Sequence, residues 1–212
     1  MKKVFLILCL ILHTLSSYAA DNKKQKSNYP KIKFGAEGGL NLANIIYHTP
    51  APVTIPTAFT ITWHAGVYSS IDFSDKLTLQ PELLYDVKGV TFPNEYTVHD
   101  NYIEIPLELK YNIGKQFFLF AGPYMAIQIN WTSTAITTTY SNLANNLPNE
   151  NTLDMGAVIG IEHQWANGFN IGLKYNQGFY NIAPHSIGYI PAYPLVLSLY
   201  VGWTFIKFSG NR

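Results

Sequence analysis

The sequence predicts an all-β chain that folds as an eight-stranded antiparallel up-and-down transmembrane β-barrel. Eight segments alternate apolar residues with polar or small ones, which is the two-residue period of a strand rather than the 3.6-residue period of a helix. The apolar side of these segments ends in aromatic residues, as strands do at a membrane interface. The N-terminus has the pattern of an export signal.

The composition excludes disorder and gives no indication of nucleic-acid binding. Of 212 residues, 14 are Lys or Arg and 13 are Asp or Glu, so the formal net charge is +1 and only 13% of residues are charged. An ordinary soluble domain has about 25% charged residues. Hydrophobic residues make up 48% of the chain and aromatic residues 15%, which is enough apolar surface to offset chain entropy. The near-neutral balance lacks the basic surface that nucleic acid requires.

The first segment has the three parts of a signal peptide. Lys2 and Lys3 form a basic start, residues 4–15 form an apolar run, and residues 17–19 place small side chains where signal peptidase cleaves. The apolar run is shorter than the roughly 20 residues of a membrane-spanning helix, which argues against an uncleaved anchor. We therefore expect residues 1–19 to be removed, residues 20–30 to form a short linker and residues 31–208 to form the barrel.

The only cysteine, Cys9, lies inside the apolar run of this first segment. Cleavage would leave a mature chain with no thiol, which excludes disulfides, cysteine metal sites and cysteine nucleophiles. An exported protein of this kind must be stabilised by other interactions.

Residues 102–111 show the strand alternation most clearly. One face carries Ile103, Ile105, Leu107, Leu109 and Tyr111, and the other carries Tyr102, Glu104, Pro106, Glu108 and Lys110. The eight predicted strands are residues 32–42, 61–73, 77–88, 102–111, 117–131, 153–165, 169–179 and 195–205. Most are near or above the length of about nine to eleven residues with which a tilted strand crosses a membrane.

The predicted connections alternate in length. Tight links lie around Ser74-Asp75, Gly114-Lys115 and Asn167-Gly168, which have the residue types of short hairpins. Long connections are expected at residues 43–60, 91–101, 132–152 and 181–194. The first and third of these are rich in Thr, Asn, Pro and Tyr, a composition found in contact surfaces but more often in loops that only connect strands.

The polar faces combine glycine with both signs of charge, which favours a crowded polar lumen over a soluble exterior. The glycines on these faces are Gly35, Gly39, Gly122, Gly156, Gly160, Gly172 and Gly178. The charged residues are Lys33, Glu37, Glu82, Asp86, Lys88, Glu104, Glu108, Lys110, Glu162 and Lys174. Because buried charges need partners, we interpret them as a structural lumenal charge network. The alternative is a narrow proton or ion path, which nothing in their spacing selects.

The apolar faces end in aromatic residues at both ends of the strands. At the short-turn end the predicted girdle is Phe34, Phe73, Tyr111, Phe117, Trp165, Phe169, Trp203 and Phe205. A looser second belt at the long-loop end contains Trp63, Tyr85, Trp131 and Phe179. Aromatic girdles of this kind mark the two interfaces of a membrane barrel. The alternative is a soluble periplasmic lipocalin-like barrel that binds a small apolar ligand, in which Ile105 and Leu107 would line the interior.

Three prolines fall inside predicted strands. Pro81, Pro106 and Pro123 each remove a hydrogen bond from the strand ladder, and a closed barrel has no free edge to receive them. We expect β-bulges to accommodate these prolines.

The segments around these prolines resemble a known family. Residues 79–85, residues 102–107 with Lys110 and Tyr111, and residues 121–124 are similar to the PorT-like outer membrane β-barrel family that is common in Bacteroidetes. The resemblance covers the expected mature chain and implies the fold and an outer-membrane location. The founding member of that family is tied to the type IX secretion system, whereas most relatives have no assigned role. Residues 209–212 depart from the aromatic C-terminal residue that is common in outer-membrane barrels.

Catalytic and metal-binding patterns are weak. A lipid-modifying enzyme would need a serine or histidine beside a base at the outer rim or on the lipid face. The candidates are His64, His99, His163, His185, Ser69, Ser70 and Ser198. No two of them share a suitable strand position and height, and His163, two residues from Trp165, fits an interface residue. No histidine spacing or acidic run has the pattern of a metal site, so we predict no catalytic, cofactor or metal residues.

These observations favour a non-enzymatic integral outer-membrane protein with a scaffold or binding role. The expected partners are outer-membrane lipid and an envelope or secretion-system protein, without nucleic acid. A link to secretion or surface assembly is implied only by the family resemblance.

Overall fold

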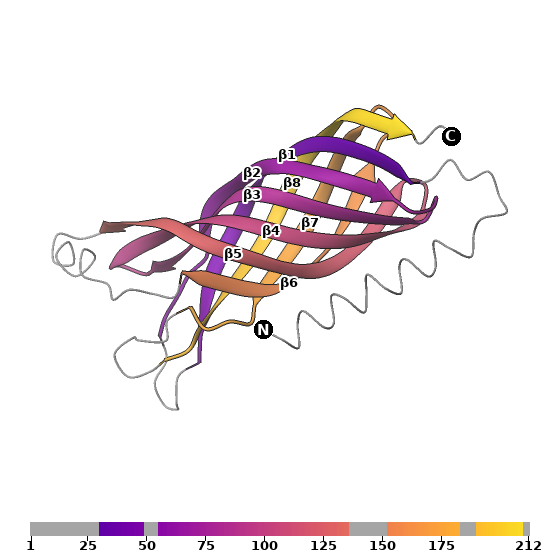
Figure 1. The fold of residues 1–212 in the computed structure, drawn as a ribbon. Coiled ribbons are helices and arrows are strands. Elements are labelled where there is room, and N and C mark those ends of the chain that lie inside the picture. Colours follow the sequence, from indigo (N-terminus) through magenta and orange to yellow (C-terminus); the bar gives the residue numbers. More distant parts are fainter. Residues whose placement is uncertain (1–29, 49–54, 136–151, 183–189, 210–212) are drawn as a thin grey trace.

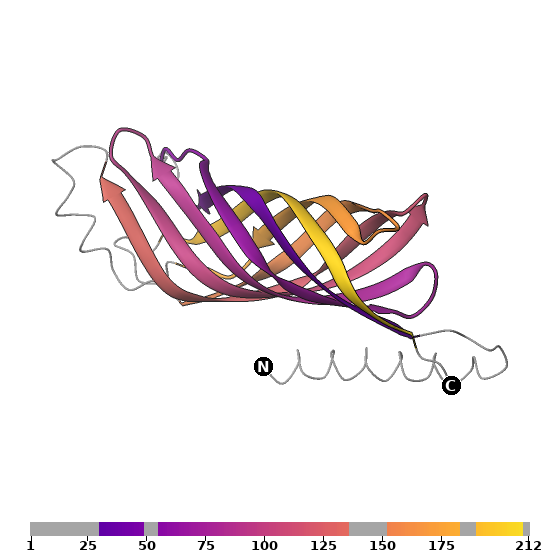
Figure 2. The ribbon, with the colours of Figure 1, turned by 90° about the horizontal axis from the view of Figure 1, so that it is seen from above.

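The computed structural model is a closed antiparallel barrel of eight strands (Figure 1). It describes residues 30–48, 55–135, 152–182 and 190–209. The strands are β1 (Lys31–Tyr47), β2 (Thr60–Asp72), β3 (Leu77–Phe92), β4 (Tyr96–Gly114), β5 (Phe117–Ala135), β6 (Leu153–Gln164), β7 (Phe169–Gly178) and β8 (Ala192–Ser209). Each strand pairs with the next, and β8 pairs with β1, so the predicted fold is confirmed. The strands slant around the barrel (Figure 2), as closure of a sheet requires.

No helix among the described residues is long and apolar enough to cross a membrane. The predicted signal peptide, Cys9 and nearly all of the predicted linker lie outside the described residues.

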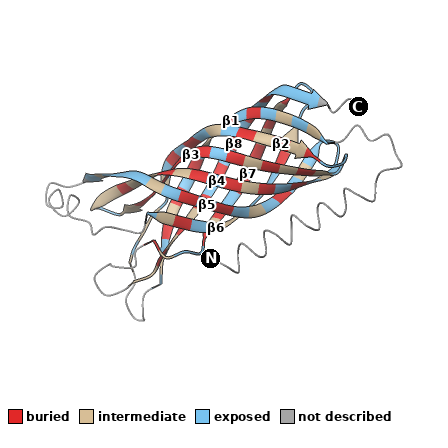
Figure 3. Ribbon diagram, in the orientation of Figure 1, coloured by how far each residue is buried: buried red, intermediate tan, exposed pale blue. Residues whose placement is uncertain are grey.

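Buried and more exposed residues alternate along the strands (Figure 3). The large exposed residues are apolar, and most charged residues of the strands are buried, so the apolar faces point outward and the polar faces inward. On β8, Leu197, Leu199, Val201 and Trp203 are 43–51% exposed, while Ser198, Tyr200, Gly202 and Thr204 are buried. Ile105 is likewise exposed. An apolar exterior over a buried polar interior is the arrangement of a membrane barrel. The alternative of a soluble barrel with Ile105 and Leu107 lining a ligand cavity is therefore wrong.

Three connections are short, as predicted, and they define the short-turn end of the barrel. They are residues 73–76, 115–116 and 165–168. Gly114, Lys115, Gln116 and Gly168 have positive φ, the backbone that tight hairpins require. The first residue of β1 and the last of β8 also lie at this end, because Lys31 pairs with Ser209. The opposite end is called the long-loop end.

The connection predicted at residues 91–101 is wrong, because β3 and β4 continue through it. Thr91 pairs with Thr97 and Phe92 with Tyr96, which leaves a three-residue turn at residues 93–95. Asn94 adopts a φ of 65°, a conformation that asparagine tolerates. β-Branched and aromatic residues on both sides favour pairing, so the hairpin extends to its turn. Large parts of the other three predicted long connections, residues 49–54, 136–151 and 183–189, lie outside the described residues.

The three strand prolines interrupt the ladders without shifting their register, so the bulges predicted there are wrong. The β3–β4 ladder has a gap between the pairs Pro81↔Leu107 and Leu84↔Glu104, with the same offset on both sides. The β4–β5 ladder has a similar gap beside Pro106 and Pro123. Because neighbouring pairs in a closed sheet hold the register, each proline costs only local bonds. The register shifts lie at Phe34/Gly35, Asn101/Tyr102 and Asn112/Gly114.

Glycines in the strands make room for large side chains inside the barrel. A Cβ added to Gly172 on β7 would meet the ring and hydroxyl of Tyr200 on β8. A Cβ on Gly160 would meet the ring of Phe120 from β5. Tyr200 and Phe120 are both buried. The glycine-rich polar faces therefore let aromatic rings lie across neighbouring strands and fill the lumen.

Replacing Gly172 by alanine is expected to lower the free energy of unfolding by about 1–3 kcal/mol, the usual cost of overpacking a filled core. The Tyr200 ring has little freedom to move because its hydroxyl donates to Glu162 Oε2 at 2.8 Å. The measurement is a urea titration of the protein in micelles, followed by tryptophan fluorescence. Gly38→Ala is the control, because its new Cβ would lie 3.4 Å or more from every neighbour. Equal losses for the two variants would contradict the packing argument.

Candidate functional site

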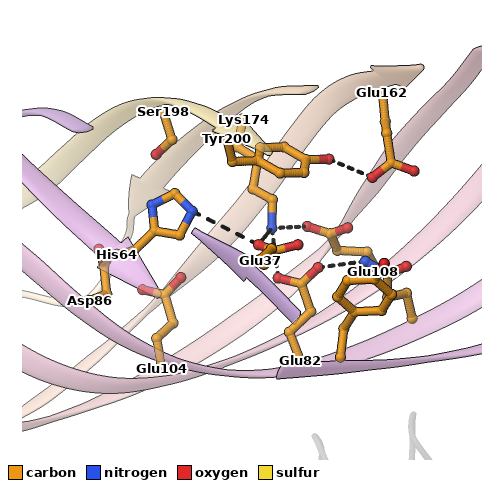
Figure 4. Close-up of polar contacts among 12 residues, drawn as sticks. Glu37, His64, Glu82, Asp86, Glu104, Glu108, Glu162, Lys174, Ser198 and Tyr200 are labelled. Carbon is orange, nitrogen blue, oxygen red and sulfur yellow. Dashed lines mark hydrogen bonds and ion pairs between the residues drawn. The ribbon is translucent and has the colours of Figure 1, made fainter. Parts of the chain in front are cut away.

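The lumen holds buried ion pairs. In the central group, a single lysine joins four strands (Figure 4). Lys174 Nζ on β7 lies 2.7 Å from Glu37 Oε1 on β1, 2.6 Å from Glu82 Oε2 on β3 and 3.2 Å from Glu108 Oε1 on β4. Its ammonium group also lies 4.6 Å from the centre of the Tyr200 ring. All of these side chains are buried. The arrangement links segments up to 137 residues apart in the sequence.

A second lysine lies on β4. Lys110 Nζ is 2.9 Å from Glu162 Oε2 and 3.6 Å from Glu108 Oε2. The Tyr200 hydroxyl donates to the same Glu162 oxygen. Glu108 is thus shared between Lys110 and Lys174, so the second ion-pair group is continuous with the first.

A third lysine, Lys88 on β3, lies in a separate group of acids. Its Nζ is 2.6 Å from Glu104 Oε2, 2.8 Å from Asp154 Oδ2 and 3.9 Å from Asp86 Oδ2. The Tyr124 hydroxyl donates to Asp154 at 3.1 Å, and the Lys88 ammonium lies 4.5 Å from the centre of that tyrosine ring.

The structure brings together nine of the ten charged residues that the sequence analysis assigned to the lumen. The tenth, Lys33, lies at the short-turn rim and pairs with Asp72 Oδ2 at 2.8 Å, where its side chain is 23% exposed. Asp154 belongs to the network but was missed. Its even spacing from Glu162 within the predicted strand was the signal that could have found it, because residues two apart on a strand share a face.

Among the described residues, the histidine and serine candidates do not form a catalytic group. His64 Nδ1 donates to Asn41 Oδ1 at 2.8 Å, since an amide oxygen can only accept. Ser198 donates to that same oxygen rather than to the imidazole. Asn41 in turn donates to Asp86 Oδ1 at 2.7 Å. His64 and Ser198 are buried in the lumen, out of reach of a lipid substrate, and their hydrogen bonds are structural.

The remaining candidates are dispersed. Ser70 donates to Gln80 Oε1 inside the barrel. His163 lies between the rings of Phe117 and Trp165, with centroids 4.4 and 4.2 Å away, which is the interface position that the sequence indicated. His185 lies outside the described residues. Among the residues that the structure describes, no group of histidine, cysteine or acidic side chains is arranged to hold a metal ion.

Both ends of the charge network are closed by packed side chains. Toward the long-loop end lies a buried apolar cluster of Ile45, Val90, Val98, Ile182 and Ala192, with Tyr47, Phe92 and Tyr96 packed against it. Toward the short-turn end, Asn170 donates to the Tyr68 hydroxyl, which is hydrogen-bonded to Thr204 Oγ1 at 2.9 Å. The interior of an eight-stranded barrel is just wide enough for side chains, and here buried side chains occupy it between these two ends.

The predicted girdle residues lie on the outer surface at the short-turn end. A chain of ring contacts runs from Phe117 through His163, Trp165 and Phe169 to Trp203. Phe34, Phe73, Tyr111 and Phe205 are also exposed there, and Phe205 is the residue left unpaired by the register shift between β1 and β8. In the second belt, Trp63 stacks on Tyr85 at 5.4 Å, while Trp131 and Phe179 are exposed. Two aromatic zones separated by aliphatic residues match the two interfaces of a bilayer.

The chain is similar to several solved structures at low sequence identity. Solved structures similar to this chain include the surface protein NspA of Neisseria, with a TM-score of 0.49 and 8% identity over 81% of this chain and 97% of that one. The attachment invasion locus protein Ail of Yersinia pestis, solved with a heparin analogue, has a TM-score of 0.46 and 8% identity over 84% of this chain and 100% of that one. OprG of Pseudomonas aeruginosa has a TM-score of 0.42 and 11% identity over 85% of this chain and 97% of that one.

The family comparison identifies the chain. No curated protein sequence matches it significantly. The family model described as "Outer membrane protein beta-barrel domain" matches residues 19–183, which is most of the chain. That match, together with the lipid-facing apolar exterior, places the protein in the lipid of the outer membrane. The chain belongs to the outer membrane protein beta-barrel domain family.

Proposed function

We propose that this protein is a non-enzymatic scaffold or binding protein of the outer membrane, which contacts an envelope protein through its long-loop end. The observation that carries the proposal is the filled lumen. Lys88, Lys110 and Lys174 tie five of the eight strands together through buried ion pairs, and the apolar cluster closes the interior above them. A barrel packed in this way offers its rims and loops, rather than a pore or an internal pocket, for function.

The positions of the histidine and serine candidates support the non-enzymatic part of the proposal. His64 and Ser198 make hydrogen bonds to Asn41 inside the barrel. His163 lies within a ring of aromatic side chains on the lipid face. None of these groups is placed as a nucleophile beside a base, which acyl-transfer chemistry on a lipid would require.

The finer assignment to the PorT-like group, with a role in secretion or surface assembly, remains part of the proposal. The motifs that carry the resemblance include Glu82, Glu104 and Lys110, which the structure places in the lumenal network. The shared motif therefore encodes the filled interior. The part that selects a partner would then lie in the connections at the long-loop end. We also propose, from the sequence pattern, that residues 1–19 are cleaved as a signal peptide.

The filled lumen predicts that the purified protein conducts no steady ionic current in a planar lipid bilayer at neutral pH. The physical reason is that ions would have to displace both the buried pairs and the apolar cluster at Ile45 and Val98. A gel of unheated against boiled sample shows that the barrel is folded in the same preparation. Stable single-channel currents, or proton flux into vesicles loaded with a pH-sensitive dye, would favour the alternative of an ion or proton path.

The accessory role is tested in the cell that produces the protein. Deleting the gene should remove a defined set of proteins from the surface or medium, and the wild-type chain should restore them. A photoreactive side chain at Phe59 or Phe179, both exposed near the long-loop end, should cross-link to one envelope protein. The matched control is Ile113, which is 52% exposed at the short-turn end, close to the 56% of Phe59. An unchanged surface and secreted protein profile would contradict the accessory role.

A further inference from the structure

The lysines of the described chain fall into two groups with different surroundings. Three lie in the lumenal network, and the other five, Lys31, Lys33, Lys76, Lys115 and Lys207, lie at the short-turn end. The acids at that end are Asp72 and Asp75. The described part of the long-loop end has Glu95 and Asp100 but no lysine. The short-turn end, which faces the periplasm in outer-membrane barrels, is therefore a basic rim.

A cavity of about 210 Å³ opens within this rim. The residues that line it include Lys33 on β1, Lys207 on β8, Gln116, Gln164, Phe118 and Trp165. At about 30 Å³ per water molecule, the cavity has room for one small anionic group with a few waters. Trp165 is also part of the aromatic girdle, so the cavity lies at the depth of lipid head groups.

The two lysines of the cavity are held beside each other by the strands. Lys33 and Lys207 are direct partners in the β1–β8 register, and like charges placed opposite one another destabilise a sheet. Asp72 balances Lys33 at 2.8 Å. Lys207 has no ion pair among the described residues. The cavity thus carries one unbalanced positive charge next to a partly buried lysine.

The amide groups add donors of the kind that a phosphate oxygen accepts. The Gln164 side chain has only a long contact of 3.5 Å from Nε2 to Thr204 Oγ1, so its amide is available to rotate toward a ligand. Ammonium groups bind phosphate as strong point charges. Two ammonium groups and two amides are a complementary set for such an anion.

We propose that the short-turn mouth of the barrel is a phosphate-binding site in which Lys33 and Lys207 hold the anion. The phosphate comes either from a phospholipid head group of the inner leaflet or from a soluble phosphate in the periplasm. Binding neutralises the repulsion between the paired lysines and joins the ends of β1 and β8, the strands that close the barrel.

The test compares two phosphate sources on the full chain. Inorganic phosphate is titrated by calorimetry into the protein in zwitterionic micelles. Separately, protein released from vesicles of equal phosphatidylglycerol and phosphatidylcholine is examined by native mass spectrometry for retained lipid. Binding in the first assay indicates soluble phosphate, and selective retention of phosphatidylglycerol alone indicates the head group. Each of these results supports the site when it depends on Lys207.

Variants make that dependence specific. Lys207→Gln and Lys33→Gln should each weaken binding by about tenfold or more, the usual effect of removing one charged hydrogen-bond partner. Lys76→Gln removes the same charge from the same end but lies outside the cavity lining, so its effect should be about twofold or less. A heat-shift gel verifies that each variant is folded. Equal weakening in Lys207→Gln and Lys76→Gln, or no binding of either phosphate source, would overturn the proposal.

Discussion

Replacing Lys174 by methionine is expected to lower the free energy of unfolding by about 3–5 kcal/mol, the range found when one partner of a buried ion pair is removed. The ammonium group is the cation nearest to Glu37 and Glu82 and one of two beside Glu108. Methionine fills much of the same volume, so little of the effect would come from a cavity. Three buried carboxyl groups would remain without that charge, which is costly in a low-dielectric interior.

A matched substitution separates burial from ion pairing as such. Lys33→Met breaks a pair of similar length, 2.8 Å to Asp72, at the partly exposed rim. Exposed pairs contribute about 1 kcal/mol or less, so this variant should be nearly as stable as the wild type. Both free energies are measured by urea titration in the same micelles. If the two variants lose similar free energies of unfolding, burial of the ion pairs around Lys174 contributes nothing to stability.

A double substitution tests whether the loss arises from charge left behind. Both carboxyl oxygens of Glu108 lack a hydrogen-bond partner, although two lysines lie nearby. Adding Glu108→Gln to Lys174→Met removes one of the abandoned charges and should restore part of the lost stability. A double-mutant cycle measures this coupling. If the effects of the two substitutions on the free energy of unfolding simply add, the contribution of the Glu108 carboxyl group to stability does not depend on Lys174.

The sequence was sufficient for the strands and their faces because the side-chain period of a strand is two residues. A slip by one position would move a whole apolar set from the lipid into the lumen. Residues 102–111 show this clearly, and β4 contains them with the predicted orientation. Residues 91–101 were misassigned because their polar residues resemble a loop, while the Thr91–Thr97 and Phe92–Tyr96 pairs continue the hairpin.

The sequence predicts that a lumenal charge network exists, but it does not predict which residues pair within it. Alternation indicates which residues face inward, but not their height along the barrel axis. Height depends on how the strands are staggered when the barrel closes. The stagger places Lys174 beside Glu37, 137 residues away, and Lys88 beside Asp154, 66 residues away. It also leaves Lys33 at the rim with Asp72, a separation that no local pattern could predict.

The prediction of β-bulges at the three strand prolines is wrong for a related reason. Alternation shows that a proline interrupts a strand but not how the neighbouring pairs respond. At Pro81, pairing with β4 resumes at Leu84 in the same register. Two of the three shifts lie near strand ends, at Phe34/Gly35 and at Asn112/Gly114 beside a tight turn, and the third lies within β4 at Asn101/Tyr102. None of them lies at a proline, so an extra residue is accommodated away from the prolines.

Leu199→Arg is expected to lower the free energy of unfolding by about 2–4 kcal/mol, the cost of an arginine on the lipid face near the bilayer midplane. Leu199 lies on β8 between the two aromatic zones and pairs with Leu40 and Leu173, both of which also face outward. The bilayer midplane has no water to solvate a charge. The arginine side chain would therefore have to extend toward the interface, or the bilayer would have to thin locally around it. The measurement is a denaturant titration of the protein in phospholipid vesicles.

The decisive comparison is with Ile113→Arg at the short-turn end of β4. Ile113 is 52% exposed and Leu199 is 51% exposed, so surface accessibility alone predicts equal effects. Depth in the membrane predicts unequal ones, because the cost of arginine falls to about 0–1 kcal/mol near an interface. In micelles, which lack a fixed hydrocarbon thickness, the difference should shrink. Equal costs in vesicles would mean that the two positions lie at the same depth, and the aromatic zones would then not mark the two interfaces.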